Sequence, residues 1–206
     1  MSTQMTHNSA YLRGSVDSPP VFSHESYGRS YFLLTLGIQR LSGARDIIRV
    51  LANRETLHAC HCAPGRFLTA EGSLRSFNNR TGVGSKLVIT VLAHTLSPGP
   101  EAYENKIFLS GALCKPPIYR QTPLGREICD IILAVGRSYG RSDYLPCIAW
   151  GAGARQCARR QVGDRLAIEG RIQSRTYIKV FEDNTQTRRV AYEVSVNNLL
   201  PEAAAP

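Results

Sequence analysis

The chain has 206 residues, of which 43% are hydrophobic and 20% are charged, a composition typical of a folded globular protein rather than a disordered one. Its 25 basic residues, only four of them lysine, outnumber 16 acidic ones, and this excess of arginine indicates a polyanionic partner. The apolar runs are too short for a membrane span, no signal core follows Met1, and six cysteines are too few for a disulfide scaffold, so we expect a cytoplasmic protein.

The predicted elements fall into two series. Displaced by 97 positions, the chain matches itself without a gap over Asn8–Ala52, with 12 identities in 45 positions. A period this long predicts two domains, which we place at residues 8–97 and 105–200. The stretch Ser97-Pro98-Gly99-Pro100 separates them, because neither a helix nor a strand readily crosses two prolines. Residues 1–7 and 201–206 are expected to be flexible tails.

Each series predicts five strands, with one short helix between the third and the fourth. In the first series the helix falls within residues 53–63 and the last hairpin spans residues 77–84. In the second series, alternating and β-branched residues predict strands at 106–114, 126–137, 143–150, 166–180 and 188–196, with the helix at 152–161. This order is that of the OB fold, so we predict an all-β protein of tandem five-stranded Greek-key barrels.

Three stretches of the second series carry a family resemblance. They are Asn105–Gly111, Thr122–Gly125 and the run from Val162 through Glu169-Gly170-Arg171 to Tyr177. They resemble the opening strand, the first turn and the long fourth strand of the bacterial single-stranded DNA-binding protein (SSB) family, with Tyr177 where that family usually has tryptophan. The resemblance covers nearly the whole second copy, whereas the first copy is reached only through the internal repeat.

The resemblance implies a protein that coats single-stranded DNA in replication, recombination or repair, and a homodimer that presents four barrels. Partners of that family are commonly recruited by an acidic tip ending in Pro-Phe. This chain ends in Pro201–Pro206, with one acid and no phenylalanine, so we expect that route to replication or repair proteins to be absent.

The resemblance also assigns four base-stacking rings, namely Tyr139, Tyr144, Trp150 and Tyr177. Every base has a flat π-face, so such rings bind any sequence at about 1–3 kcal/mol per base. Basic side chains near them are predicted to contact the phosphates: Lys106, Arg137, Arg141, Arg171, Arg175 and Lys179. Barrel core is the alternative role for these rings, and the sequence leaves it open, above all for Trp150.

The first copy is poorer in such residues. At the aromatic positions it has Ser42, Ile47 and Asn53. Near the position that matches Tyr177, only Phe77 and Arg75 are candidates for DNA binding. Residues 1–104 carry 10 basic and 7 acidic residues, and residues 105–206 carry 15 and 9, so the net charges are +3 and +6. We therefore expect the second copy to do most of the DNA binding, and the first to serve assembly or to extend the binding path weakly.

Other functions remain possible at this point. A primosome-type OB adaptor would act mainly through protein contacts, and stacking rings alone do not distinguish RNA from DNA. No catalytic set of side chains recurs, so we expect neither an enzyme nor a cofactor. The cluster His58-Ala59-Cys60-His61-Cys62 has a tighter cysteine spacing than zinc sites use, so no metal is expected either.

Overall fold

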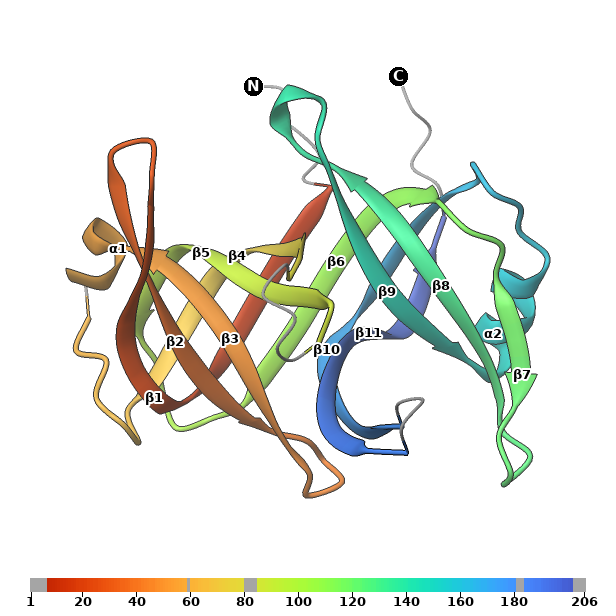
Figure 1. Ribbon diagram of the computed structural model, residues 1–206, viewed down its shortest axis with the longest axis horizontal. Coiled ribbons are helices and arrows are strands. Elements are labelled where there is room, and N and C mark those ends of the chain that lie inside the picture. Colours follow the sequence, from red (N-terminus) through yellow and green to blue (C-terminus); the bar gives the residue numbers. More distant parts are fainter. Residues whose placement is uncertain (1–6, 59, 80–84, 181–183, 202–206) are drawn as a thin grey trace.

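The computed structural model describes residues 7–58, 60–79, 85–180 and 184–201, and the side chains of Tyr139 and Lys179 also lie outside the described part. Within these ranges the chain is mostly β-strand, and no helix is both long and apolar enough to cross a membrane. Two five-stranded barrels stand side by side in Figure 1. The predicted all-β OB architecture is confirmed.

The first barrel consists of β1 (Asn8–Ser26), β2 (Arg29–Gln39), β3 (Arg45–Asn53), α1 (Arg54–His58), β4 (Phe67–Asn78) and β5 (Leu87–Pro98). Its strands run in the order β2-β3-β5-β4-β1, and pairing of β1 with β2 closes the barrel. Helix α1 is shorter than the predicted 53–63, which we attribute to the weak helix propensity of the residues that follow it. Cys60 therefore lies beyond the helix.

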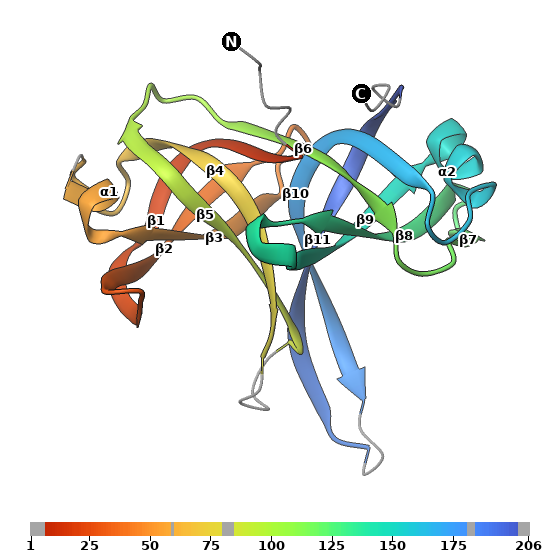
Figure 2. The same ribbon diagram turned by 90° about the horizontal axis from the view of Figure 1, so that it is seen from above.

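The second barrel repeats this plan. It consists of β6 (Glu104–Leu113), β7 (Ile118–Gln121), β8 (Glu127–Gly136), η1 (Ser138–Gly140), β9 (Ser142–Trp150), α2 (Gly151–Ala158), β10 (Arg165–Val180) and β11 (Gln186–Leu200). Its strands run in the order β6-β10-β11-β9-β8, closed by pairing of β6 with β8, while β7 is added at the edge of β8. In Figure 2 the β10–β11 hairpin projects from the same side as the β4–β5 hairpin.

Inward-facing aliphatic residues fill both barrels. Alternate positions of β3 are buried, as are alternate positions of β9, which is the pattern of a strand with one face on the core. The repeated Glu-Gly pair also has a structural reason. A Cβ atom at Gly72 would lie 1.9 Å from the carbonyl oxygen of Leu92, and one at Gly170 would lie 2.3 Å from that of Ser195. Both glycines follow a β-bulge, where only glycine allows this approach.

Strands β1 and β6 join the two barrels into one continuous sheet. They pair antiparallel, with Asn8 opposite Leu109, Ala10 opposite Ile107 and Leu12 opposite Asn105. Because the repeat period is 97 residues, Ala10 faces its own repeat equivalent. The barrels are therefore related by a pseudo-two-fold axis at this point, like the subunits of a symmetric dimer. Whether the segments 8–97 and 105–200 fold as separate domains stays a prediction.

Candidate nucleic-acid interface

The outer face of β9, β11 and β10 is the candidate interface. Ile172 and Val194 are paired across β10 and β11, and both are buried in the core. Their neighbours Arg171 and Ser195, also paired, must therefore point outward, because successive side chains of a strand alternate between its faces. Strand β9 runs parallel to β11, and its alternate residues from Tyr144 onward lie on the same outer face.

Aromatic rings occupy both ends of this face on β9. Tyr144 is 53% exposed and Trp150 is 39% exposed, so neither ring belongs to the buried core. The indole Nε1–H of Trp150 donates a hydrogen bond to Ser195 Oγ at 3.2 Å, which holds one edge of the ring against β11. Its flat face is thus oriented by a strand of the same sheet. Stacking requires this kind of fixed, accessible ring.

The β10 strand supplies the third ring together with basic groups. Tyr177 is half-buried, and the guanidinium carbon of Arg175 lies 6.0 Å from the centre of its ring. Arg175 itself is exposed, whereas Arg171 is half-buried. A cation next to an aromatic ring suits a ligand that alternates bases and phosphates.

The remaining predicted residues are scattered around this face. Arg141 is exposed after η1, and Lys106 is exposed on β6, where its Nζ lies 3.0 Å from Glu104. Phe77, 47% exposed, belongs to β4 of the first barrel. Tyr139 falls in η1 and Lys179 in β10, but their side chains lie outside the described part of the structure.

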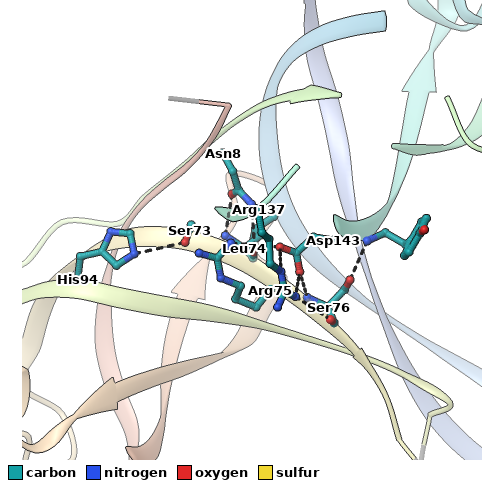
Figure 3. Close-up of polar contacts among 9 residues, drawn as sticks. Asn8, Ser73, Leu74, Arg75, Ser76, His94, Arg137 and Asp143 are labelled. Atoms are coloured by element: carbon teal, nitrogen blue, oxygen red, sulfur yellow. Dashed lines mark hydrogen bonds and ion pairs between the residues drawn. The ribbon is translucent and has the colours of Figure 1, made fainter. Parts of the chain in front are cut away.

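Arg137, predicted to contact a phosphate, and Arg75, a predicted DNA-binding residue of the first copy, are both held by a buried carboxylate (Figure 3). Arg137 Nε donates to Asp143 Oδ2 at 2.5 Å, and its Nη2 donates to Asp143 Oδ1 and to the carbonyl oxygen of Ser76. Arg75 Nη1 donates to Asp143 Oδ2 at 3.1 Å, and the Ser76 amide donates to Oδ1 at 2.5 Å. Both guanidinium groups thus stabilise the contact between the barrels, and any phosphate would compete with Asp143.

A second carboxylate makes the equivalent contact on the other side of the pseudo-two-fold axis. Asp46 receives two hydrogen bonds from Arg40, at 2.7 and 2.5 Å, and two from the amide and hydroxyl of Ser174, at 2.7 and 2.8 Å. Burial by itself raises the pKa of Asp46, but the hydrogen bonds from Arg40 and Ser174 outweigh it, and the pKa lies below its usual value. We call the two carboxylates and their partners the junction clusters.

Sequence reasoning did not find the junction clusters. It recognised the matching residues only as identities of the repeat, although Arg and Asp six positions apart recur in both copies, as Arg40/Asp46 and Arg137/Asp143. That repeated ion pair was the available signal. A buried aspartate needs a charged or hydrogen-bonding partner, and in both copies the arginine six positions earlier supplies it.

The cysteine and histidine cluster shows no metal geometry in the part described. The sulfurs of Cys60 and Cys62 lie 3.4 Å apart, and burial is the main cause that raises the pKa of Cys60 to about 12. Among the described residues, no three His, Cys, Asp or Glu side chains gather as a metal site would require.

Comparison with known proteins identifies the second barrel. Residues 104–201 match the model of the Single-strand binding protein family. The chain is 32% identical over 93 residues to a "Single-stranded DNA-binding protein" of Halalkalibacterium halodurans, covering 42% of this chain and 52% of that protein. It is also 32% identical over 97 residues to "Single-stranded DNA-binding protein 2" of Listeria innocua, covering 44% and 58%. The chain thus spans about half the length of the curated relatives it matches.

A solved structure is similar over both barrels. The wild-type single-stranded DNA binding protein from Thermus aquaticus matches with a TM-score of 0.77 at 21% identity, covering 97% of this chain and 94% of that one. At this identity the match establishes the fold of the first barrel as well as the second. The second barrel therefore matches the Single-strand binding protein family, and the whole chain shares the fold of the Thermus aquaticus protein.

Proposed function

We propose that the protein binds single-stranded DNA without sequence preference, through the outer face of the second barrel. One observation carries this proposal: Tyr144 and Trp150 present accessible rings on β9, and Arg171, Arg175 and Tyr177 lie on the same face of β10. Rings take the bases and guanidinium groups take the phosphates, so no base-specific contact is required. The net charge of +6 on residues 105–206 adds a long-range attraction.

The curated relatives support the same function. Their names state single-stranded DNA binding. We propose that this protein likewise protects exposed strands during replication, recombination or repair, as a binding protein without catalytic activity. Tyr139, Arg141 and Lys179 are proposed as further contacts of the second barrel, and Lys106 as a flanking one.

The sole tryptophan gives a direct test. Titration with oligo-dT is expected to quench the fluorescence of Trp150 to saturation, because a stacked base quenches the indole. Replacing Trp150 by Ala should weaken binding about 5- to 150-fold, as measured by the anisotropy of a labelled strand, whereas Trp150→Phe should retain most of the affinity. Unchanged fluorescence together with equal affinity of the Ala variant would refute the proposal. Stronger competition by RNA of equal length would reassign the ligand to RNA.

We also propose that two chains associate, so that four barrels act together, as the family resemblance implies. Light scattering of the purified full chain measures this directly. A mass of two chains is expected, and a single-chain mass at micromolar concentration would contradict the assembly without affecting the proposal of DNA binding.

A further inference from the structure

A pocket of about 370 Å³ lies next to the junction cluster of Asp46. Its lining combines both barrels: Gln39, Arg40 and Asp46 come from the first, and Asn105 and Arg171 from the second, with Tyr103 from the connection between them. The volume is within the range of pockets that hold small ligands or parts of larger ones.

Arg171 is the unusual member of this lining. Its Nε is buried and has no hydrogen-bond partner, and it takes part in none of the ion pairs found among the described residues. A buried donor without an acceptor is unfavourable, and such groups are rare in folded proteins. An anion bound in the pocket would supply the acceptor that this guanidinium needs.

The one carboxylate of the pocket cannot serve as that anion. Asp46 already accepts four hydrogen bonds, two from Arg40 and two from Ser174. The pair formed by Arg40 and Asp46 is neutral, so Arg171 gives the pocket a net positive charge. Planar guanidinium groups bind phosphate oxygens in a forked arrangement, which makes a phosphate the fitting occupant.

The pocket continues the candidate interface toward the first barrel. Arg171 is paired across the sheet with Ser195, whose hydroxyl accepts the hydrogen bond of Trp150. Neighbouring strands are about 4.8 Å apart, so Arg171 lies roughly 10 Å across β11 from the strand that carries Trp150. Tyr103 also lines the pocket; it is 41% exposed, and its ring packs on Phe67 with centres 5.2 Å apart. A strand that left Trp150 toward the first barrel would therefore meet a cation and then a further ring.

We propose that this pocket binds a backbone phosphate of single-stranded DNA where the strand passes from the second barrel to the first. Arg171 pairs with the phosphate, Gln39 offers an amide donor, and Tyr103 stacks on the adjoining base. The inference rests on the proposed function and extends it, because it makes the connection and the first barrel part of one continuous binding path.

Strand length separates this inference from the proposed function. An OB barrel covers about 4–16 nucleotides, so dT of about 8 nucleotides reports on the second barrel and dT of about 30 on both. The Tyr103→Ala variant should bind the long strand about fivefold more weakly and the short strand unchanged. Tyr119→Ala is the matched control, because Tyr119 is also 41% exposed but belongs to β7, at the outer edge of the second barrel in Figure 1. The Tyr119→Ala variant should bind strands of both lengths with the affinity of the wild type.

Arg171→Gln provides the second measurement. For binding of the long strand by this variant, the slope of log K against log salt concentration should be shallower by about 0.7. This is the change expected when one phosphate contact is lost. Equal long-strand affinities of Tyr103→Ala and Tyr119→Ala, or an unchanged salt slope of Arg171→Gln, would overturn the inference while Trp150→Ala still tests the proposed function. Calorimetry with thymidine monophosphate tests whether the pocket binds the phosphate of a free nucleotide rather than that of a DNA strand. Saturable binding of it that needs Arg171, with strand binding indifferent to Tyr103, would assign the pocket to a free nucleotide instead.

Discussion

The two barrels share one topology but present different side chains on the same outer face. In the second barrel the face of β9, β11 and β10 carries rings and basic groups. In the first barrel the matching face of β3, β5 and β4 has Phe77 at its end and basic groups at Arg49 and Arg75, but aliphatic side chains fill much of the rest: Ile47, Leu51, Val88 and Leu92. The inward residues and the junction clusters are alike in both. The fold thus depends on the inward face, while the outward face is free to acquire a binding function.

One repeat-related pair illustrates the difference. Asn53 and Trp150 both precede the short helix of their barrel. Asn53 Oδ1 accepts a hydrogen bond from the Thr56 amide at 2.8 Å and so caps α1, whereas the Trp150 side chain forms no cap for α2. The first barrel uses the position for helix stability, and the second presents a ring there.

The largest effect of a substitution, a loss of stability, is expected at the junction clusters, which are alike in both barrels. Replacing Asp143 by Ala leaves Arg137 and Arg75 without their shared acceptor, and Asp46→Ala does the same to Arg40. Breaking a buried ion pair typically costs about 3–5 kcal/mol, so both variants should lose that much unfolding free energy in urea titrations. Asp17→Ala, which removes an exposed pair with Arg45, should cost under about 1 kcal/mol. Two junction variants no worse than this control would show that the clusters do not hold the barrels together.

The binding difference gives the next prediction. Tyr144→Ala should weaken strand binding by about 1–3 kcal/mol, or about 5- to 150-fold, whereas Ile47→Ala at the matching position should leave it unchanged. Fluorescence anisotropy with labelled oligo-dT measures both. Equal losses would mean that both barrels bind equally, and the division of labour would be wrong.

A smaller effect concerns the helix cap. Asn53→Ala removes the acceptor for the Thr56 amide, so we expect about 0.5–2 kcal/mol lower stability with unchanged strand affinity. Trp150→Ala should show the opposite pattern, with a large loss of strand affinity and a small change in stability. Thermal melts and anisotropy on the same preparations decide this, and a loss of affinity in Asn53→Ala would contradict it.

The smallest effect is a change with pH. The pKa of Asp46 is lowered in the folded protein, so its contribution to stability is complete above the ordinary aspartate pKa of about 3.8 and is lost as the pH falls through the folded value. Asp46→Asn cannot lose a charge there. Its unfolding free energy, measured in urea titrations, should therefore fall less steeply with decreasing pH than that of the wild type below about pH 4. Parallel plots of unfolding free energy against pH would show that Asp46 does not have a lowered pKa.

How much the sequence predicts depends on the range of the interaction. Strand periodicity and the order of strands and helix predicted the OB architecture, because alternation is a local property of a half-buried strand. The junction could not be predicted in this way, since Asp46 and Ser174 are 128 residues apart and meet only when the barrels pair. The same limit applies to Arg137 and Arg75. Their charge predicts contact with DNA, but their ion pairs with the buried Asp143 form only in the tertiary structure. The orientation of the Trp150 ring likewise depends on a distant residue, because its hydrogen-bond partner Ser195 is 45 residues away in the sequence.

The pairing of β1 with β6 has a consequence for how such a protein can change. In a dimer of identical chains, any substitution appears twice and alters both sides of the axis together. Here the halves belong to one polypeptide, so their association does not weaken on dilution, and each can vary alone. A ring added to one barrel, or a cap kept in the other, leaves its counterpart untouched.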